Sequence, residues 1–116
     1  MNTPYIDSYR FGQIIINGQV HTRDVIILPD SVQGDWWRKS GHNLTIGDLQ
    51  PVFSAGPEVL VIGRGAVKRM KVPSETRQAL GEAGIEVIAL SSNEACQRYN
   101  ELCQTRRVAA AIHLTC

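Results

Sequence analysis

Two glycines around an arginine, Gly63-Arg64-Gly65, follow a short apolar run and form the first pattern in the chain that favours ligand binding. Ligands of α/β proteins bind beyond the carboxyl ends of strands, and glycines let backbone amides approach an anion closely. The pattern lacks the third glycine of a dinucleotide site, and no Gly-Lys-Ser/Thr of a phosphate loop follows. The alternative interpretation is a tight turn that needs a positive φ.

A run of basic residues begins at the same place, with no acidic residue between Gly63 and Val72. Its members are Arg64, Lys68, Arg69 and Lys71. Beside the glycines, these side chains can hold an anionic ligand or an acidic partner surface. A solvated loop explains the same charges, so both interpretations stay open.

The adjacent tryptophans Trp36 and Trp37 are a large apolar group in a polar stretch that also contains His42. Neighbouring residues on a strand point to opposite faces, so one indole would pack inward and the other would mark a contact surface. The alternative is that both rings cover the core from its edge. The pair is a candidate interaction site.

Residues for nucleophilic catalysis or metal binding are scattered. Cys96, Cys103 and Cys116 form no CxxC pair, and the histidines are not clustered, which argues against zinc. His113 and Cys116 would project to opposite faces of a predicted strand, so we expect no Cys–His dyad. The odd number of cysteines argues against a disulfide framework. We predict no catalytic residue, no metal and no cofactor.

The elements that position these residues begin with β-strands. Residues 9–16 are rich in isoleucine and end at Asn17-Gly18, the strongest short signal for a hairpin turn. Another strand is predicted over 24–28, and its Val-Ile-Ile-Leu run is apolar on both faces, which is typical of a strand covered on both sides. A short helix is predicted over 45–49 and is expected to end before Pro51.

The second half of the chain alternates strands with helices. Strands are predicted over 59–62, 85–90 and 108–114, and helices over 73–83 and 91–107. This order predicts βαβ crossovers and a mostly parallel sheet, with the early hairpin at its edge or in a separate β-layer. No repeat or linker interrupts the sequence, so we predict a single α/β domain over 1–116.

The overall charge and hydropathy exclude several classes of protein. A formal net charge of +1 gives no global attraction to nucleic acid or anionic lipid. No apolar run approaches the ~20 residues that span a bilayer, and the first residues have no features of a secretory signal. We therefore predict a cytoplasmic protein that binds no nucleic acid and has no membrane span.

Several short motifs occur in an order and spacing found in a known family. They are Pro29 with the tryptophan pair, Gly63-x-Gly65, Pro73, Ser92-x-x-Ala95, Tyr99-Asn100-x-Leu102, Arg107, and the ending His113-Leu114-Thr115-Cys116. The sequence resembles the Mth-type family of unknown function that includes mitochondrial complex I assembly factor three and the adipogenesis-associated domain protein. It departs from that family at Arg64, where a small residue is usual.

The resemblance implies a three-layer α/β fold around a central mixed sheet and no established enzymatic activity. Some relatives bind other proteins while a respiratory complex is assembled. Our leading hypothesis is a non-enzymatic protein-interaction or assembly-factor-like module with an unknown protein partner, and a homo-oligomer is compatible with it. The alternative is a small-molecule binding protein or an enzyme with an anionic ligand at residues 63–65.

These hypotheses depend on two groups of residues. The candidates for ligand binding are Gly63, Arg64, Gly65, Arg69, Ser92, Asn100 and Arg107, and the candidates for interaction are Trp36 and Trp37. Asn100 and Arg107 contribute only if the last helix packs beside the glycine loop. We therefore expect Asn100 to bond to backbone near that loop, and Tyr99 to be buried.

Overall fold

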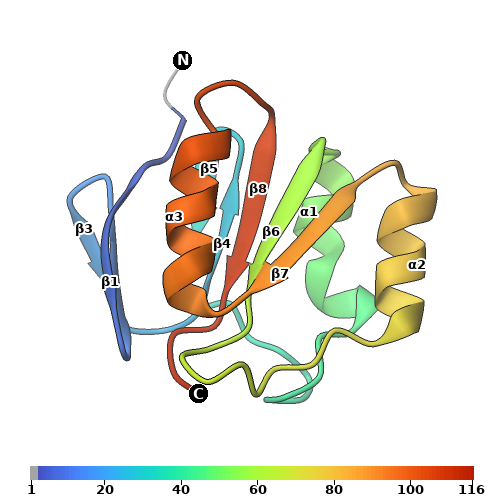
Figure 1. Ribbon diagram of the computed structural model, residues 1–116, viewed down its shortest axis with the longest axis horizontal. Helices are drawn as coiled ribbons and strands as arrows, with labels where there is room; N and C mark the ends of the chain where they lie inside the picture. The colour runs from blue at the N-terminus through green and yellow to red at the C-terminus, as the bar shows by residue number, and fades with distance from the viewer. Residues whose placement is uncertain (1–2) are drawn as a thin grey trace.

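The computed structural model describes residues 3–116 and contains two sheets (Figure 1). A small antiparallel sheet has the order β1-β2-β3, and the main sheet has the order β5-β4-β8-β6-β7. The strands of the small sheet are β1 (Ile6–Arg10), β2 (Gln13–Ile16) and β3 (Gln19–His21). The strands of the main sheet are β4 (Val25–Leu28), β5 (Ser31–Gln33), β6 (Val59–Gly63), β7 (Glu86–Leu90) and β8 (Val108–Ile112). The helices are the 3-10 helix η1 (Ile46–Leu49), α1 (Gln50–Ala55), α2 (Ser74–Glu82) and α3 (Ser92–Leu102).

The predicted N-terminal hairpin is part of a three-stranded sheet. Asn17 and Gly18 have φ values of 51° and 78°, as the turn between β2 and β3 requires. A second turn at Phe11-Gly12, where Gly12 has a φ of 80°, divides the predicted strand 9–16 into two antiparallel strands. The isoleucine-rich pattern concealed this turn because a single glycine was its only signal.

The main sheet is mixed, but it is not mostly parallel as predicted. Strand β6 pairs in parallel with β7 and β8, whereas β4 pairs antiparallel with β8 and β5. Helix α2 connects β6 to β7, and α3 connects β7 to β8, so the predicted βαβ crossovers are present. The antiparallel half exists because β4 and β5 form a hairpin that adds to the edge of β8.

The main sheet is covered on both faces (Figure 1). Along β6, Val59 and Val61 face a core shared with α3 and the small sheet, while Leu60 and Ile62 face a core shared with α1 and α2. The expected burial of Tyr99 is confirmed, because its side chain is fully buried. Its hydroxyl donates to the carbonyl of Pro4 at 2.7 Å.

The helix expected to end before Pro51 instead continues past it. Helix η1 runs directly into α1, in which Pro51 lies in the first turn. A proline is tolerated there because the first-turn amides of a helix have no partner within the helix.

Several loops and turns lie together at one end of the strands of the main sheet. They comprise residues 10–12, 22–24, 34–45, 64–73 and 113–116, which we call the carboxyl edge because β6, β7 and β8 end there (Figure 1, bottom). The loops over 34–45 and 64–73 lie side by side, joined by a backbone bridge between Asn43 and Lys71. The amide of Gly12 bonds to the carbonyl of Leu114 at 2.9 Å, which attaches the β1–β2 turn to the same edge.

Candidate functional site

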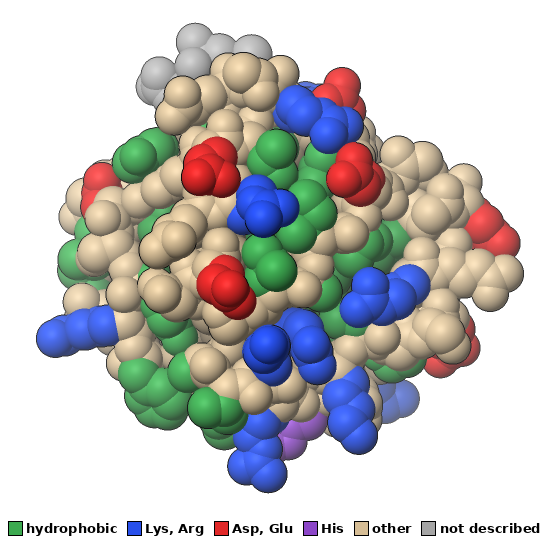
Figure 2. Space-filling view, viewed as in Figure 1, with side chains coloured by type: hydrophobic (Ala, Val, Ile, Leu, Met, Phe, Trp, Pro, Cys, Tyr) green, Lys and Arg blue, Asp and Glu red, His purple; other side chains and the backbone are tan. Residues whose placement is uncertain are grey.

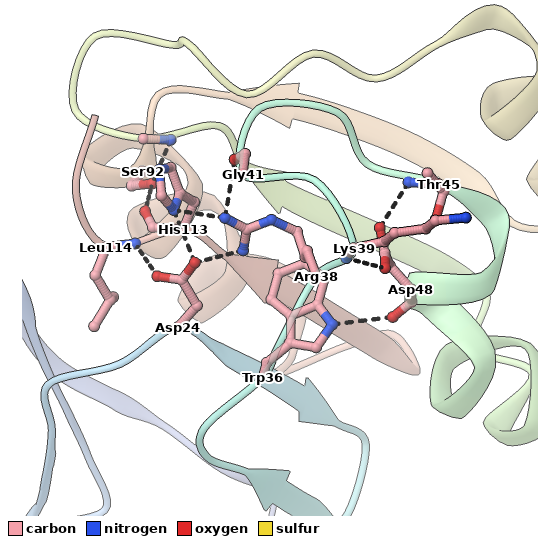
Figure 3. A network of polar contacts seen from close by, with 11 residues as sticks. Asp24, Trp36, Arg38, Lys39, Gly41, Thr45, Asp48, Ser92, His113 and Leu114 are labelled. Atoms are coloured by element: carbon pink, nitrogen blue, oxygen red, sulfur yellow. Dashed lines mark hydrogen bonds and ion pairs between the residues drawn. The ribbon is translucent and has the colours of Figure 1, made fainter.

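A largely buried carboxylate, Asp24, lies at the centre of a polar network on the carboxyl edge (Figure 3). Its Oδ2 accepts hydrogen bonds from Arg38 Nη1 and, at 2.8 Å, from His113 Nδ1. Its Oδ1 accepts a hydrogen bond from the amide of Leu114 at 2.8 Å. The side chains of Arg38 and His113 are only 6% and 9% exposed, so the three groups form a buried ionic cluster.

The cluster shows which ring nitrogen of His113 bears the proton that faces Asp24. Because a carboxylate only accepts hydrogen bonds, the 2.8 Å contact with Asp24 places the proton of the imidazole on Nδ1. Nδ1 also lies 3.1 Å from Arg38 Nη2. Since both nitrogens carry hydrogens, this contact is not a hydrogen bond, and it arises because His113 and Arg38 both donate to the carboxylate of Asp24. The other ring nitrogen, Nε2, is buried and has no hydrogen-bond partner among the described residues.

The surroundings of Asp24 stabilise its ionised form. Burial by itself would raise the pKa of the carboxyl. Hydrogen bonds from His113, from the amide of Leu114 and from Arg38 outweigh that effect, so the pKa of Asp24 lies below its usual value. Asp24 is therefore ionised near neutral pH and pairs with the permanent charge of Arg38.

Arg38 connects this cluster to the tryptophan loop (Figure 3). Its guanidinium lies 4.9 Å from the centre of the Trp36 ring, within reach of a cation–π interaction, and its Nη2 donates to the carbonyl of Gly41 at 3.1 Å. The indole of Trp36 donates to the carbonyl of Asp48 at 3.0 Å. The carboxylate of Asp48 accepts from the amides of Lys39 and Thr45. This irregular loop is therefore held by side chains at both ends.

A cleft of about 310 Å³ lies beside the cluster. Asp24, Trp36, Arg38 and His113 line it, together with Arg23, Asp35, Trp37 and Thr115. The two tryptophans lie on no strand. Trp36 is half-buried, whereas Trp37 is 78% exposed, so Trp37 presents an indole to solvent at a cleft whose base is fixed.

The cluster contains two members of a catalytic triad, a histidine and the aspartate that orients it, but it has no nucleophile bonded to the histidine. A triad needs a hydroxyl or thiol nucleophile bonded to the second ring nitrogen, and Nε2 of His113 has no partner within residues 3–116. The nearby hydroxyl of Ser92 donates to the backbone carbonyl of His113 and not to its ring. The arrangement suits a structural clamp better than nucleophilic catalysis.

The glycine loop uses its amides to hold the chain itself. The amides of Arg64, Gly65 and Ala66 bond to the carbonyl of Leu90, the hydroxyl of Ser92 and the carbonyl of Thr115. Gly65 has a φ of 100°, and a Cβ there would overlap the backbone of Cys116. The glycine is therefore required by close approach of segment 113–116, and these amides cannot also cradle an anion.

The predicted ligand-binding residues occupy three separate places. Arg64, Gly65 and Arg69 lie on the carboxyl edge, and Gly63 and Ser92 adjoin it at the end of β6 and the start of α3. The guanidinium of Arg64 donates to the carbonyls of Met70 and Lys68, so it closes its own loop.

Asn100 and Arg107 lie away from that loop. The prediction that Asn100 bonds to backbone near the glycine loop is wrong. Its side chain bonds instead to both the amide and the carbonyl of Ile6 in β1. Asn100 is two helical turns beyond Ser92, and this distance along α3 carries it to the small sheet. Arg107 precedes β8 and donates to the carbonyl of Ala55 at 2.8 Å, at the opposite end of the main sheet.

Sequence reasoning missed the Asp24–Arg38–His113 cluster. Its members are separated by 14 to 89 positions, and only His113 belongs to one of the short family motifs. Arg38 directly follows the tryptophan pair in the sequence but carried no prediction, and His113 was considered only with Cys116 and as part of that motif. A polar residue directly before the buried strand β4 was the one local signal, and it is also the ordinary pattern of a strand end.

Comparison with known families identifies the chain. Residues 6–113 match the family described as Protein of unknown function (DUF498/DUF598). The chain belongs to this family. The match covers both sheets and the whole Asp24–Arg38–His113 cluster, so these features lie within the DUF498/DUF598 domain.

Two curated relatives of this DUF498/DUF598 domain are named as assembly factors. The chain is 31% identical over 109 residues to human NADH dehydrogenase [ubiquinone] 1 alpha subcomplex assembly factor 3, and 31% identical to its counterpart in Rattus norvegicus. The alignments cover 92% of this chain but only 58% of each relative.

Solved structures of similar fold cover almost the whole chain. A conserved hypothetical protein from Pyrococcus horikoshii has a TM-score of 0.83 and 25% identity, over 96% of this chain and 98% of that one. A protein from Bartonella henselae, described as an outer membrane protein, has a TM-score of 0.85 and 26% identity over 98% and 97% of the two chains. In residues 3–116 of the present chain, no helix has the length and apolar character needed to cross a membrane.

Proposed function

We propose that this chain is a non-enzymatic protein-interaction module, and that its partner docks on Trp37 and the adjoining cleft. The observation that carries the proposal is the 78% exposure of the Trp37 indole beside a cleft with a fixed base. Tryptophan is among the residues that most often dominate binding energy at protein interfaces. An indole left in water on an ordered loop is the expected form of such an anchor.

The loop that carries Trp37 is preorganised for binding. Its neighbours Trp36 and Arg38 are fixed by the carbonyl of Asp48 and by the carboxylate of Asp24. A partner that docks on such a loop orders fewer side chains, so less conformational entropy is lost on association. The buried cluster then acts as the support of the contact surface.

The curated relatives support a role in protein assembly. Those named above are called assembly factors, a function that consists of contacts with other proteins. Since the chain spans 58% of their length, the part of that function assigned here is partner binding by the shared domain.

The alternative of an anionic small-molecule ligand at residues 63–65 has less support. The amides of Arg64, Gly65 and Ala66 are bonded within the protein, and the Arg64 side chain is bonded to its own loop. An anion would have to replace these bonds rather than fill free donors. Exposed basic side chains, Lys68, Arg69 and Lys71, remain around the loop.

The test is a crosslinked pull-down of the tagged protein from its native cells, followed by mass spectrometry. We expect one protein to co-purify in stoichiometric amount with the unmodified bait and with the Tyr5→Ser variant, but not with the Trp37→Ser variant. Tyr5 is a matched control because it is also an exposed aromatic, 46% exposed, whose backbone lies beside Asn17 at the far end of the small sheet. Both variants should keep the unfolding transition of the unmodified protein.

Two results contradict the proposal. One is a bait that captures no protein in stoichiometric amount, including no second copy of itself. The other is a partner whose capture is equally strong with Trp37→Ser and Tyr5→Ser, since binding would then use another surface.

A further inference from the structure

The net charge of the chain is near neutral, but positive and negative side chains are unevenly distributed over the molecule. The segments of the carboxyl edge contain eight basic and two acidic residues, a formal charge of +6, whereas the remaining residues contain four basic and nine acidic residues, a formal charge of −5. The basic residues of the edge are Arg10, Arg23, Arg38, Lys39, Arg64, Lys68, Arg69 and Lys71. The molecule is therefore positive at the edge that bears Trp37 and negative over the rest.

Most of these basic side chains are available to a partner. Arg38 and Arg64 are used within the fold, but the other six are exposed. No ion pair involves Lys68, Arg69 or Lys71 within residues 3–116. Figure 2 shows Lys and Arg side chains gathered over the lower part of the molecule.

The same edge exposes three apolar side chains. Phe11, Trp37 and Val67 are 64%, 78% and 67% exposed. Segment 113–116 lies between their loops, because the amide of Gly12 bonds to Leu114 and that of Ala66 bonds to Thr115. Exposed apolar groups among unpaired basic groups form a surface that complements an acidic chain with apolar side chains.

We infer that the partner segment bound at the carboxyl edge is an acidic peptide segment with an apolar side chain that packs on Trp37. This inference rests on the proposed function and specifies the chemistry of the partner. The carboxylates of the segment pair with Lys68, Arg69 and Lys71, and its apolar side chain enters the cleft. Electrostatic complementarity of this kind speeds association and selects among partners.

A polypeptide fits this surface better than a nucleic acid. Asp24 and Asp35 line the cleft next to Trp37, and the side chain of Asp35 is 84% exposed. Asp35 is paired with Arg23 at 3.7 Å and Asp24 with Arg38, so the cleft has no net charge to hold a phosphate, whereas a peptide places an uncharged side chain there. The aliphatic Val67 also offers no face on which a base can stack.

The experiment is a selection of random displayed peptides on the immobilised folded protein, followed by affinity measurement on the enriched peptides by fluorescence anisotropy. We expect the enriched peptides to be rich in Asp and Glu and to share one aromatic or aliphatic residue. The double variant R69E/K71E should weaken their binding by about tenfold or more. The double variant R77E/R98E makes the same change of charge on the exposed faces of α2 and α3 and should leave binding within about twofold.

The outcomes separate this inference from the proposed function. The inference of an acidic partner segment is contradicted if the enriched peptides are neutral or basic. It is also contradicted if they bind the R69E/K71E variant and the unmodified protein with equal affinity. If those peptides still lose binding with Trp37→Ser, the proposed function stands without it. A selection that enriches no Trp37-dependent peptide contradicts both. A single-stranded oligonucleotide that displaces the peptides and binds more tightly than they do also overturns the inference, in favour of a nucleic acid.

Discussion

At the scale of residues, Asp24 is the point at which the candidate site is assembled. Its carboxylate accepts from Arg38 in the tryptophan loop and from His113 and Leu114 after β8. Removing two charges from water costs several kcal/mol per ion unless each is well paired. The pairing of Asp24 is complete, whereas Nε of Arg38 and Nε2 of His113 have no partner within residues 3–116. The cluster therefore depends on this single carboxylate.

Replacement of Asp24 by Asn should destabilise the protein strongly near neutral pH. The substitution leaves Arg38 buried without its counter-ion, a change that typically costs about 3–5 kcal/mol. The free energy of unfolding measured by urea denaturation at neutral pH gives this value directly. Asp30→Asn is the matched control, because Asp30 is an exposed aspartate outside the cluster and its loss should change stability by less than about 0.5 kcal/mol.

The effect of Asp24→Asn should also depend on pH. Because the pKa of Asp24 is lower in the folded state than in the unfolded state, its ionisation stabilises the protein fully above the unfolded-state pKa, near 4. That contribution is lost as the pH falls through the lower folded-state pKa. The difference in stability between the unmodified protein and Asp24→Asn should therefore shrink as the pH falls from about 5 through the pKa of the folded state. A difference that stays constant over that range would show that Asp24 is not the titrating group.

At the scale of elements, α3 holds the two sheets and the glycine loop together. Its first residue, Ser92, is fully buried, accepts from the amide of Gly65 at 2.9 Å and donates to the carbonyl of His113. Two turns later, Asn100 bonds to both backbone groups of Ile6 and so fastens β1 to the same helix. One helix therefore fixes the base of the carboxyl edge at its N-terminus and the small sheet along its length.

Replacement of Ser92 by Ala should loosen the carboxyl edge without unfolding α3. The substitution leaves the amide of Gly65 and the carbonyl of His113 buried without their partner, which costs about 1–3 kcal/mol. We expect faster hydrogen exchange at the Gly65 amide, measured residue by residue by NMR. Ser91→Ala is the matched control, since Ser91 accepts from the amide of Glu94 and only caps the helix. Equal acceleration of Gly65 exchange in both variants would refute the specific role of Ser92.

The sequence was sufficient for the elements whose signal is local. Asn17-Gly18 marked a turn, and the run Val59–Ile62 marked a buried strand, because turn chemistry and burial are encoded in adjacent residues. The parallel share of the sheet was overestimated because pairing between β4 and β8 joins residues more than eighty positions apart. The Asp24 cluster was missed for the same reason. Its members meet only after the sheet has formed.

At the scale of the whole molecule, the fold has two cores separated by the main sheet, whose central strands β4, β8 and β6 are buried. Strand β8 is Val-Ala-Ala-Ala-Ile, and all five residues are buried. The small alanines let the layers on both faces approach the sheet closely. Cys96 lies in the core between α3 and the sheet, and burial raises the pKa of its thiol to about 12.

The reactivity of Cys96 should therefore report opening of the whole domain. Under native conditions at neutral pH, Cys96 should be alkylated by iodoacetamide more than about a hundredfold more slowly than the half-buried Cys116, because labelling requires unfolding of the core. Mass spectrometry of digested samples over time distinguishes the two sites. In concentrated urea the two rates should become equal. Comparable rates in the native protein would mean that α3 separates from the sheet locally.

The central place of β8 has a consequence for how the domain is made. Strand β8 comes last in chain order among the strands of residues 3–116, yet it lies between β4 and β6 and supplies a hydrogen-bonded neighbour to each. Until it emerges, the nascent chain holds a β4–β5 hairpin and a β6–β7 pair that have no contact through the sheet, and each has an unpaired apolar edge. Unpaired edges of this kind are sites of aggregation. We therefore expect synthesis of this domain to pass through an intermediate with exposed strand edges until β8 is made, and truncation before β8 to yield two open half-sheets rather than a smaller folded domain.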